Sequence, residues 1–173
     1  MIVIVMGVCG CGKSTVGQAL ANQLGWPFFD ADDFHPPANV AKMAKGVALT
    51  DEDREPWLDG VAAEMRAVTR KGHHAVLACS ALKESYRQRI ARGLEDPQAE
   101  GESSSELRIV YLKGDAKTIE PRLALRSGHF MPASLLASQF AVLEEPDQAM
   151  VIDIRQTTEA QAAQIAAALR STV

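Results

Sequence analysis

The chain has 173 residues, which is the length of about one domain and is enough to bury a hydrophobic core. Its 18 basic and 22 acidic residues give a net charge of −4, and without a basic stripe this balance argues against a nucleic-acid partner. No apolar run reaches the roughly 18 residues that a membrane-spanning helix needs, so we expect no membrane contact.

The chain begins with a short apolar run, Ile2 to Met6, which predicts a fully buried strand. Because this run leads directly into a glycine-rich turn, we do not expect it to be a cleaved signal peptide. Residues 15–24 then place apolar side chains on one face of a predicted helix. The turn between strand and helix, residues 7–14, reads Gly-Val-Cys-Gly-Cys-Gly-Lys-Ser.

This turn matches G-x-x-x-x-G-K-[ST], the pattern of phosphate-binding loops, in the strand–turn–helix context that such a loop requires. Its backbone N–H groups and the start of the helix would surround phosphate oxygens. Lys13 is expected to reach the β- and γ-phosphates of ATP, and the Ser14 hydroxyl to hold Mg²⁺. The predicted nucleotide site consists of Gly7, Val8, Cys9, Gly10, Cys11, Gly12, Lys13, Ser14 and Thr15.

A second apolar segment, residues 27–29, predicts a strand that ends in Asp-Ala-Asp-Asp-Phe-His. Ligands of open parallel sheets lie beyond the carboxyl ends of the strands, so these carboxylates should face the phosphate loop. A carboxylate of this cluster can position and deprotonate an acceptor hydroxyl; helix capping is the alternative for any one of these aspartates. If the chain stays extended, Asp30 and Asp32 share one side and Asp33 points away to solvent. His35 would donate a hydrogen bond to a hydroxyl-rich or carboxylate ligand, or be structural.

Residues 50–53, Thr-Asp-Glu-Asp, form a plausible capping box that predicts the start of a long helix, and Gly72 should end it. Arg54 lies in the first turn of this helix. Its acidic neighbours are compatible with an ordinary surface ion pair. The alternative is a bidentate clamp on the carboxylate of a substrate.

The strand predicted over residues 74–79 ends beside another group of polar residues. Ser80 and Lys83 are therefore candidates for the same crevice, with Arg87 one turn beyond Lys83 on a helix predicted over residues 83–92. The alternative is that Ser80 caps this helix and that both cations are exposed.

Residues 95–106 are acidic and almost free of apolar side chains. Such a segment buries too little apolar surface to order itself, so we expect a mobile surface insertion before a strand at residues 107–112. It is not a domain boundary, because neither side would keep a complete sheet.

A pair of cations marks the next helix, predicted over residues 116–127. Arg122 and Arg126 lie one helical turn apart, and a flexible Gly-His-Phe joint separates them from a helix over residues 132–142. This pattern is typical of a hinged lid, at about residues 122–132, that brings cations to a transferring phosphoryl group. A solvated helix face is the alternative.

The last strand is predicted over residues 150–154, before a helix that begins near Thr158 with Gln161 as its capping partner. Five strands that alternate with helices predict an α/β fold, in which a parallel sheet is covered by helices on both faces. We expect a single domain over residues 1–173.

Motifs along nearly the whole chain resemble those of the gluconokinases, small P-loop kinases related in fold to shikimate and nucleoside monophosphate kinases. The phosphate-loop pattern is shared by many protein families, whereas the Asp-Arg-x-Pro-Trp-Leu and Gly-His-Phe blocks are specific to few. The blocks that carry the resemblance are residues 7–14, 30–36, 42–46, 49–58, 79–83, 128–131 and 138–144.

The resemblance implies ATP-dependent phosphorylation of D-gluconate on its 6-hydroxyl, a five-stranded parallel sheet, a mobile lid and commonly a homodimer. It implies that Lys13, Asp32 and Arg126 act in catalysis and that Arg122 and Arg126 belong to the lid side of ATP. Besides Asp32 and Ser80, the positions expected near the sugar acid are His35, Arg54, Lys83, His129 and Gln139.

Two other functions stay open at this point. Another small-acceptor kinase, such as a shikimate kinase, would share the phosphate loop and would also bind a carboxylate with hydroxyls. A nucleotide-dependent switch without transfer chemistry would leave Asp32 and the lid arginines without a role.

Three cysteines, an odd number, argue against a disulfide framework and favour a reducing cytoplasm. Cys9 and Cys11 replace the small hydroxyl residues that are usual in the family. A thiol at a helix N-terminus beside Lys13 is expected to have a lowered pKa and to react readily.

Overall fold

The computed structural model describes residues 1–95, 106–125 and 134–171. Its strands form one parallel sheet in the order β2-β3-β1-β4-β5: β1 (Ile2–Met6), β2 (Phe28–Asp30), β3 (Ala75–Ala78), β4 (Leu107–Lys113) and β5 (Met150–Asp153). The helices are α1 (Lys13–Leu24), α2 (Pro37–Ala44), α3 (Asp51–Arg70), α4 (Glu84–Leu94), α5 (Ala116–Ala124), α6 (Ser134–Val142) and α7 (Thr158–Arg170), with a 3₁₀ turn, η1, at Ala31–Phe34.

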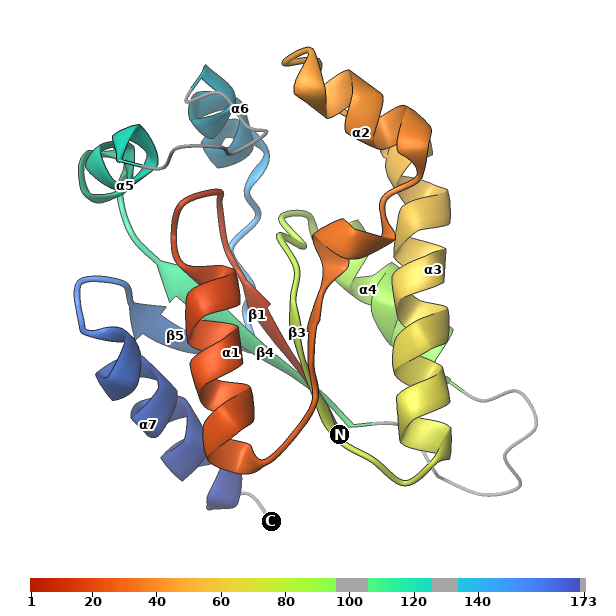
Figure 1. Cartoon of the computed structure of the whole chain (residues 1–173), viewed down its shortest axis with the longest axis vertical. Helices are drawn as coiled ribbons and strands as arrows, with labels where there is room; N and C mark the ends of the chain where they lie inside the picture. The colour runs from red at the N-terminus through yellow and green to blue at the C-terminus, as the bar shows by residue number, and fades with distance from the viewer. Residues whose placement is uncertain (96–105, 126–133, 172–173) are drawn as a thin grey trace.

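The central strand β1 is apolar at every position because it contributes to a core on each face of the sheet. Val3 and Val5 pack with α1 and α7, whereas Ile2, Ile4 and Met6 pack with α3 and α4. Helices therefore cover both faces, as the apolar runs predicted (Figure 1).

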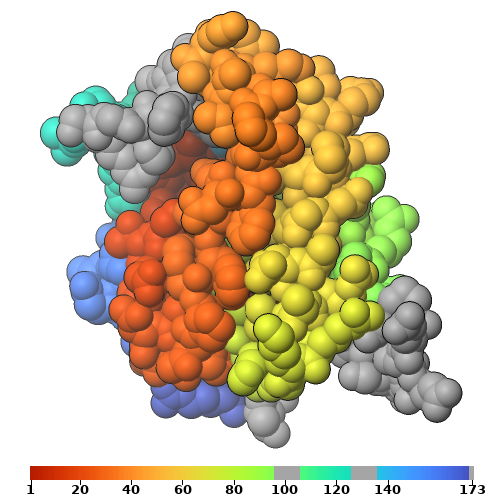
Figure 2. Space-filling model, turned by 45° about the vertical axis from the view of Figure 1, so that its right-hand side comes forward, coloured from red at the N-terminus to blue at the C-terminus, as the bar shows by residue number. Residues whose placement is uncertain are grey.

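The carboxyl ends of the three inner strands meet at one edge of the sheet. Val5 of β1 is in register with Ala78 of β3 and Val110 of β4. Consequently the phosphate loop, η1 and the turn after β3 all leave this edge, and α2 and α6 lie beyond it (Figure 1). The space-filling view shows α2, in orange, above α1 and α3 (Figure 2).

One described helix was not predicted. α2 begins at the second of two prolines and has eight residues, of which only Asn39 is buried, so it contributes little to the core. Pro37 at its first turn suits a helix start, since proline needs no hydrogen bond for its missing N–H there.

α7 begins at Thr158 as predicted, but its cap differs from the prediction. Its N-cap is Thr157, whose hydroxyl accepts a hydrogen bond from the N–H of Ala160 at 3.2 Å. Gln161 does not close a capping box; its amide donates to the carbonyls of Ile154 and Gln156 instead. Among the described residues, no helix is long and apolar enough to cross a membrane.

Candidate active site

The phosphate loop has the backbone shape that its glycines predict. Gly7, Gly10 and Gly12 have φ angles of 145°, 77° and 103°, a region that favours glycine. A Cβ on Gly7 would lie 2.8 Å from the Cys11 sulfur and 2.9 Å from the Leu112 carbonyl oxygen. Helix α1 starts at Lys13 with no side-chain cap, so its first N–H groups point into the loop.

The two polar side chains of the loop have partners that suit their predicted roles. The Lys13 ammonium donates to the Val8 carbonyl at 3.1 Å, across the loop. The Ser14 hydroxyl donates to the Asp30 carboxylate at 2.6 Å. Hydroxyl and carboxylate oxygens coordinate Mg²⁺ in proteins, usually together with phosphate oxygens and water. Sequence analysis assigned the metal to Ser14 and missed Asp30 as its partner.

The acidic segment after β2 does not stay extended, so the condition under which Asp33 would point away is not met. Residues 31–34 form η1, and Asp30 caps it by accepting the N–H of Asp32 at 3.1 Å. Because a turn replaces the alternation of a strand, Asp33 does not point away from the site. It is exposed as predicted, but it lines the same cavity as Asp30 and Asp32.

His35 is held by stacking rather than by an ion pair. Its ring lies parallel to Trp57, with 4.2 Å between ring centres, and the Trp57 indole N–H donates to the Ala31 carbonyl. Burial, with a smaller effect of Arg54, lowers the pKa of His35 to about 4. His35 Nε2 lies 3.7 Å from an Asp32 oxygen, but a neutral ring at pH 7 makes this a polar contact without full charges.

One cavity of about 540 Å³ brings most of the predicted site together at the carboxyl edge. It is bounded by the phosphate loop, η1, α2, the starts of α3 and α4, and α6. The predicted residues that line it are Cys9, Gly10, Gly12, Lys13, Ser14, Asp32, His35, Arg54, Ser80, Lys83 and Gln139.

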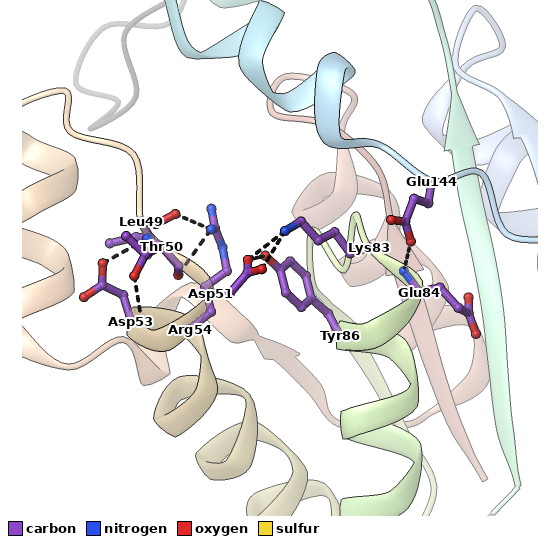
Figure 3. Close-up of polar contacts among 9 residues, drawn as sticks. All are labelled: Leu49, Thr50, Asp51, Asp53, Arg54, Lys83, Glu84, Tyr86 and Glu144. Carbon is purple, nitrogen blue, oxygen red and sulfur yellow. Dashed lines mark hydrogen bonds and ion pairs between the residues drawn. The ribbon is translucent and has the colours of Figure 1, made fainter.

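Sequence analysis missed a polar cluster on one wall of this cavity, where α3 meets α4 (Figure 3). The Asp51 carboxylate accepts two hydrogen bonds from Lys83, at 2.8 and 2.7 Å, and another from the Tyr86 hydroxyl. The Arg54 guanidinium donates to the Leu49 carbonyl. Asp51 was assigned only to the cap of α3, and its bond to Lys83 joins positions 32 apart, which no local pattern reveals.

The cations after β3 do not behave alike. Lys83 lines the cavity, whereas Arg87 is 5% exposed and does not reach it. The Arg87 guanidinium donates to the carbonyls of Ala81 and Leu82 and pairs with Glu84, so it braces the turn that carries Ser80. Arg87 is therefore neither exposed nor part of the cavity, and both predictions for it are wrong. The N-cap residue of α4 is Lys83, not Ser80.

The expected reactivity of the loop thiols is wrong for Cys11. Its side chain is 1% exposed, and burial raises the pKa of the thiol, an effect that nearby Lys13 offsets only in part. A buried neutral thiol is a weak nucleophile. Cys9 is also buried, and its backbone N–H donates to the Gln139 side-chain oxygen at 2.6 Å. This bond joins α6 to the phosphate loop.

A second cavity, of about 400 Å³, lies along the phosphate loop toward α5 and α7. Gly10 and Gly12 line both cavities, whereas Thr15 and Arg122 line only this one. The Arg122 guanidinium donates to the Ile154 carbonyl at 2.8 Å, so it is not a freely solvated cation. Sequence analysis missed the other polar residues of this cavity, Gln156, Thr157, Thr158 and Gln161.

Several predicted residues lie outside the part of the chain that the structure describes. Arg126, His129 and the remainder of the expected lid after residue 125 are among them, as are residues 96–105 of the acidic insertion.

Comparisons with known proteins show which kinases this chain is similar to. A family model described as shikimate kinase matches residues 9–170, which include the lining of both cavities. A probable gluconokinase from Mus musculus is 48% identical over 152 residues, which are 84% of this chain and 83% of that protein. A gluconokinase from Gluconobacter oxydans is 48% identical over 143 residues, 83% of this chain and 75% of that protein. The crystal structure of a gluconokinase from Sinorhizobium meliloti matches with a TM-score of 0.78 and 36% identity, covering 98% of this chain and 95% of that one.

Proposed function

The chain belongs to the shikimate kinase family and, within it, to the gluconokinases, and from this premise we propose that it transfers the γ-phosphoryl group of ATP to the 6-hydroxyl of D-gluconate. The products are 6-phosphogluconate and ADP. The observation that carries the proposal is a single cavity lined both by the phosphate-loop residues Lys13 and Ser14 and by the carboxylate of Asp32. A phosphate donor and a hydroxyl acceptor need these groups side by side.

Phosphoryl transfer asks the protein for positioning and charge stabilisation rather than for covalent chemistry. In the proposed reaction, Lys13 and the loop N–H groups hold the phosphates of ATP. Asp32 orients the 6-hydroxyl in line with the γ-phosphorus and accepts its proton as the new P–O bond forms and the bond to ADP breaks. Arg126 and His129 remain proposed members of the site, as lid cation and acceptor contact.

We assign Mg²⁺ to Ser14 and Asp30, whose oxygens lie 2.6 Å apart. The donor set fits this metal, because Mg²⁺ is usually bound by one or two protein oxygens together with substrate phosphates. When bound, it would neutralise charge on the β- and γ-phosphate oxygens. Among the described residues, no group of three or more His, Cys, Asp or Glu side chains offers a competing metal site.

The second cavity is the proposed site for the nucleoside of ATP. It shares Gly10 and Gly12 with the first cavity, which we call the acceptor cavity because Asp32 and the proposed acceptor contacts line it. A triphosphate that passes over the loop would therefore reach from one cavity to the other. Arg122 lies on this side, which suits its expected place beside ATP.

A panel of acceptors tests the proposed function directly. The purified chain, with ATP and Mg²⁺, is given D-gluconate, shikimate, a nucleoside monophosphate or no acceptor, and ADP release is measured. We expect release with gluconate alone. Release with shikimate would favour the second candidate, which rests on the description of the matching family model. ADP release without acceptor would indicate a nucleotide hydrolase instead.

A homodimer and a cytoplasmic location complete the proposal. Cys9, Cys11 and Cys79 are all buried and none of them forms a disulfide within the described residues, which suits a reducing compartment. Light scattering of the purified chain measures its mass and tests the dimer.

A further inference from the structure

The acceptor cavity is polarised from one end to the other. Its charged lining residues are acidic where β2 ends beside the phosphate loop, at Asp30, Asp32 and Asp33. On the wall formed by α3 and α4, the cations Arg54 and Lys83 outnumber Asp51. Lys13 is the cation at the acidic end, where the proposed function uses it for the phosphates. A ligand with one anionic end is therefore attracted to the α3–α4 wall.

One aromatic ring holds the two cations of that wall together. The Arg54 guanidinium carbon lies 5.6 Å from the centre of the Tyr86 ring, and the Lys83 ammonium lies 5.4 Å from it. Both distances are within the range of a cation–π attraction. Tyr86 itself is only 8% exposed, so its ring is fixed by packing from α3 and α4.

Asp51 binds one of these cations, Lys83, together with the Tyr86 hydroxyl (Figure 3). Its carboxylate accepts both bonds from Lys83 and one from the Tyr86 hydroxyl, and it lowers the repulsion between Lys83 and Arg54. Hydrogen bonding to Asp51 raises the pKa of Lys83, so the ammonium stays charged at neutral pH.

Donors for a ligand remain on Arg54. An ammonium has three N–H donors and a guanidinium has five. Among the described residues, Lys83 directs its bonds to Asp51, while Arg54 uses Nη1 alone for the Leu49 and Thr50 carbonyls. The rest of the Arg54 fork is thus available to a planar carboxylate, and the charged Lys83 ammonium lies on the same wall.

We propose that Tyr86 and Asp51 are positioning residues. They hold Arg54 and Lys83 in place so that these two cations bind the carboxylate of the acceptor. The inference rests on the proposed function and deepens it. With its carboxylate at the α3–α4 wall, an open-chain polyhydroxy acid presents the hydroxyl at its opposite end to Asp32. The polarity of the cavity thus selects an acid over a neutral polyol and sets which end is phosphorylated.

Two substitutions of Tyr86 separate the contributions of its hydroxyl and its ring. Tyr86→Phe keeps the ring and loses the bond to Asp51, and it should raise the KM for gluconate about threefold to tenfold. Tyr86→Leu also removes the cation–π contacts and should raise this KM by about tenfold or more. In both variants kcat stays within about twofold and the KM for ATP is unchanged, since the phosphate loop is untouched.

The matched control is Tyr111→Phe. Tyr111 is buried in β4, its hydroxyl also contacts a carboxylate, that of Glu145, and it does not line the acceptor cavity. Its substitution should leave the KM for gluconate unchanged. Circular dichroism establishes folding, and Tyr86→Phe, which keeps the packed ring, carries the test if Tyr86→Leu does not fold.

D-Glucitol has an alcohol in place of the carboxylate. It therefore distinguishes a loss of carboxylate binding from a general disruption of the acceptor cavity. The wild type should prefer gluconate, and this preference in kcat/KM or in affinity should shrink in the Tyr86 variants. Equal losses for both ligands, an unchanged gluconate KM, or a wild type that binds glucitol as tightly as gluconate would overturn the inference. Those results still leave gluconate phosphorylation intact, whereas a wild type that is inactive on gluconate refutes the proposed function itself.

Discussion

At the scale of single residues, the surroundings of each polar group decide what it contributes. Asp30 and Asp32 are two positions apart, yet one accepts the Ser14 hydroxyl and caps η1 while the other lies exposed in the cavity. His35 and Lys83 both line that cavity, but burial keeps the first neutral and Asp51 keeps the second charged. From residue type alone, Asp30 and Asp32 would be assigned the same role, and His35 and Lys83 would both be taken for cations.

Asp32→Asn tests the proposed base. The amide keeps the size of the side chain but cannot accept the proton of the hydroxyl, so kcat should fall by about 10²-fold or more. ATP binding, measured by calorimetry, should be unchanged because the phosphate loop is intact. The control is Asp59→Asn, at an exposed residue that pairs with Arg89 away from the cavity. Asp33 does not serve as this control, because it lines the cavity. Retained turnover in Asp32→Asn would move the base elsewhere.

His35 makes the stability of the fold depend on pH in a specific window. Its folded pKa of about 4 lies below the ordinary value of 6.5, so between these values the unfolded chain takes up a proton that the folded chain does not. The free energy of unfolding should therefore fall as the pH drops from 6.5 toward 4. His35→Phe keeps a ring over Trp57 without titrating and should lose less stability over this range in urea titrations. Parallel pH curves for the two proteins would contradict a buried neutral His35.

At the scale of elements, the start of α3 connects the stability of the fold to acceptor binding. Thr50 and Asp53 close a reciprocal capping box, with bonds of 3.2 and 2.9 Å. Lys42 and Asn39 of α2 bond to Asp53 as well, so the two helices are joined at this cap. The same turn carries Asp51 and Arg54 into the cavity.

Thr50→Ala removes the cap of α3. We expect it to lower the free energy of unfolding by about 1 kcal/mol and to raise the KM for gluconate severalfold, because the first turn that holds Asp51 and Arg54 frays. Denaturant unfolding and steady-state kinetics measure the two effects. Thr157→Ala deletes the equivalent cap of α7 at a similar cost in stability. Because Thr157 lines the second cavity, the comparison is made at saturating ATP, where the KM for gluconate should be unchanged. An equal rise in both variants would indicate a general effect of stability.

At the scale of the whole molecule, the parallel sheet places two cavities along one phosphate loop. Residues from α2, α3, α4 and α6 bound the first, whereas α5 and the start of α7 bound the second. In the proposed function, donor and acceptor therefore occupy different cavities, which share Gly10 and Gly12 of the loop.

This arrangement predicts a sequential mechanism. Because ATP and gluconate occupy the site together, double-reciprocal plots at several fixed gluconate concentrations should intersect. ADP–ATP exchange should not occur without gluconate, since no protein group takes the phosphoryl in between. Parallel lines or exchange without the acceptor would require a phosphorylated enzyme and would contradict direct transfer.

The sequence alone determined the parts of this protein that depend on local pattern. The apolar runs predicted five parallel strands, the glycines predicted the phosphate loop, and Thr50 to Asp53 predicted the cap of α3. Each of these features depends on neighbouring residues: the spacing of apolar side chains, the backbone conformation of glycine and the capping of a helix end. Only the tertiary structure decided that Asp51, Lys83 and Tyr86 form one cluster, that Arg87 is buried and that burial raises the pKa of Cys11. These features depend on which helices meet across the edge of the sheet and on how much water remains there, and both are set by the packing of residues far apart in the chain.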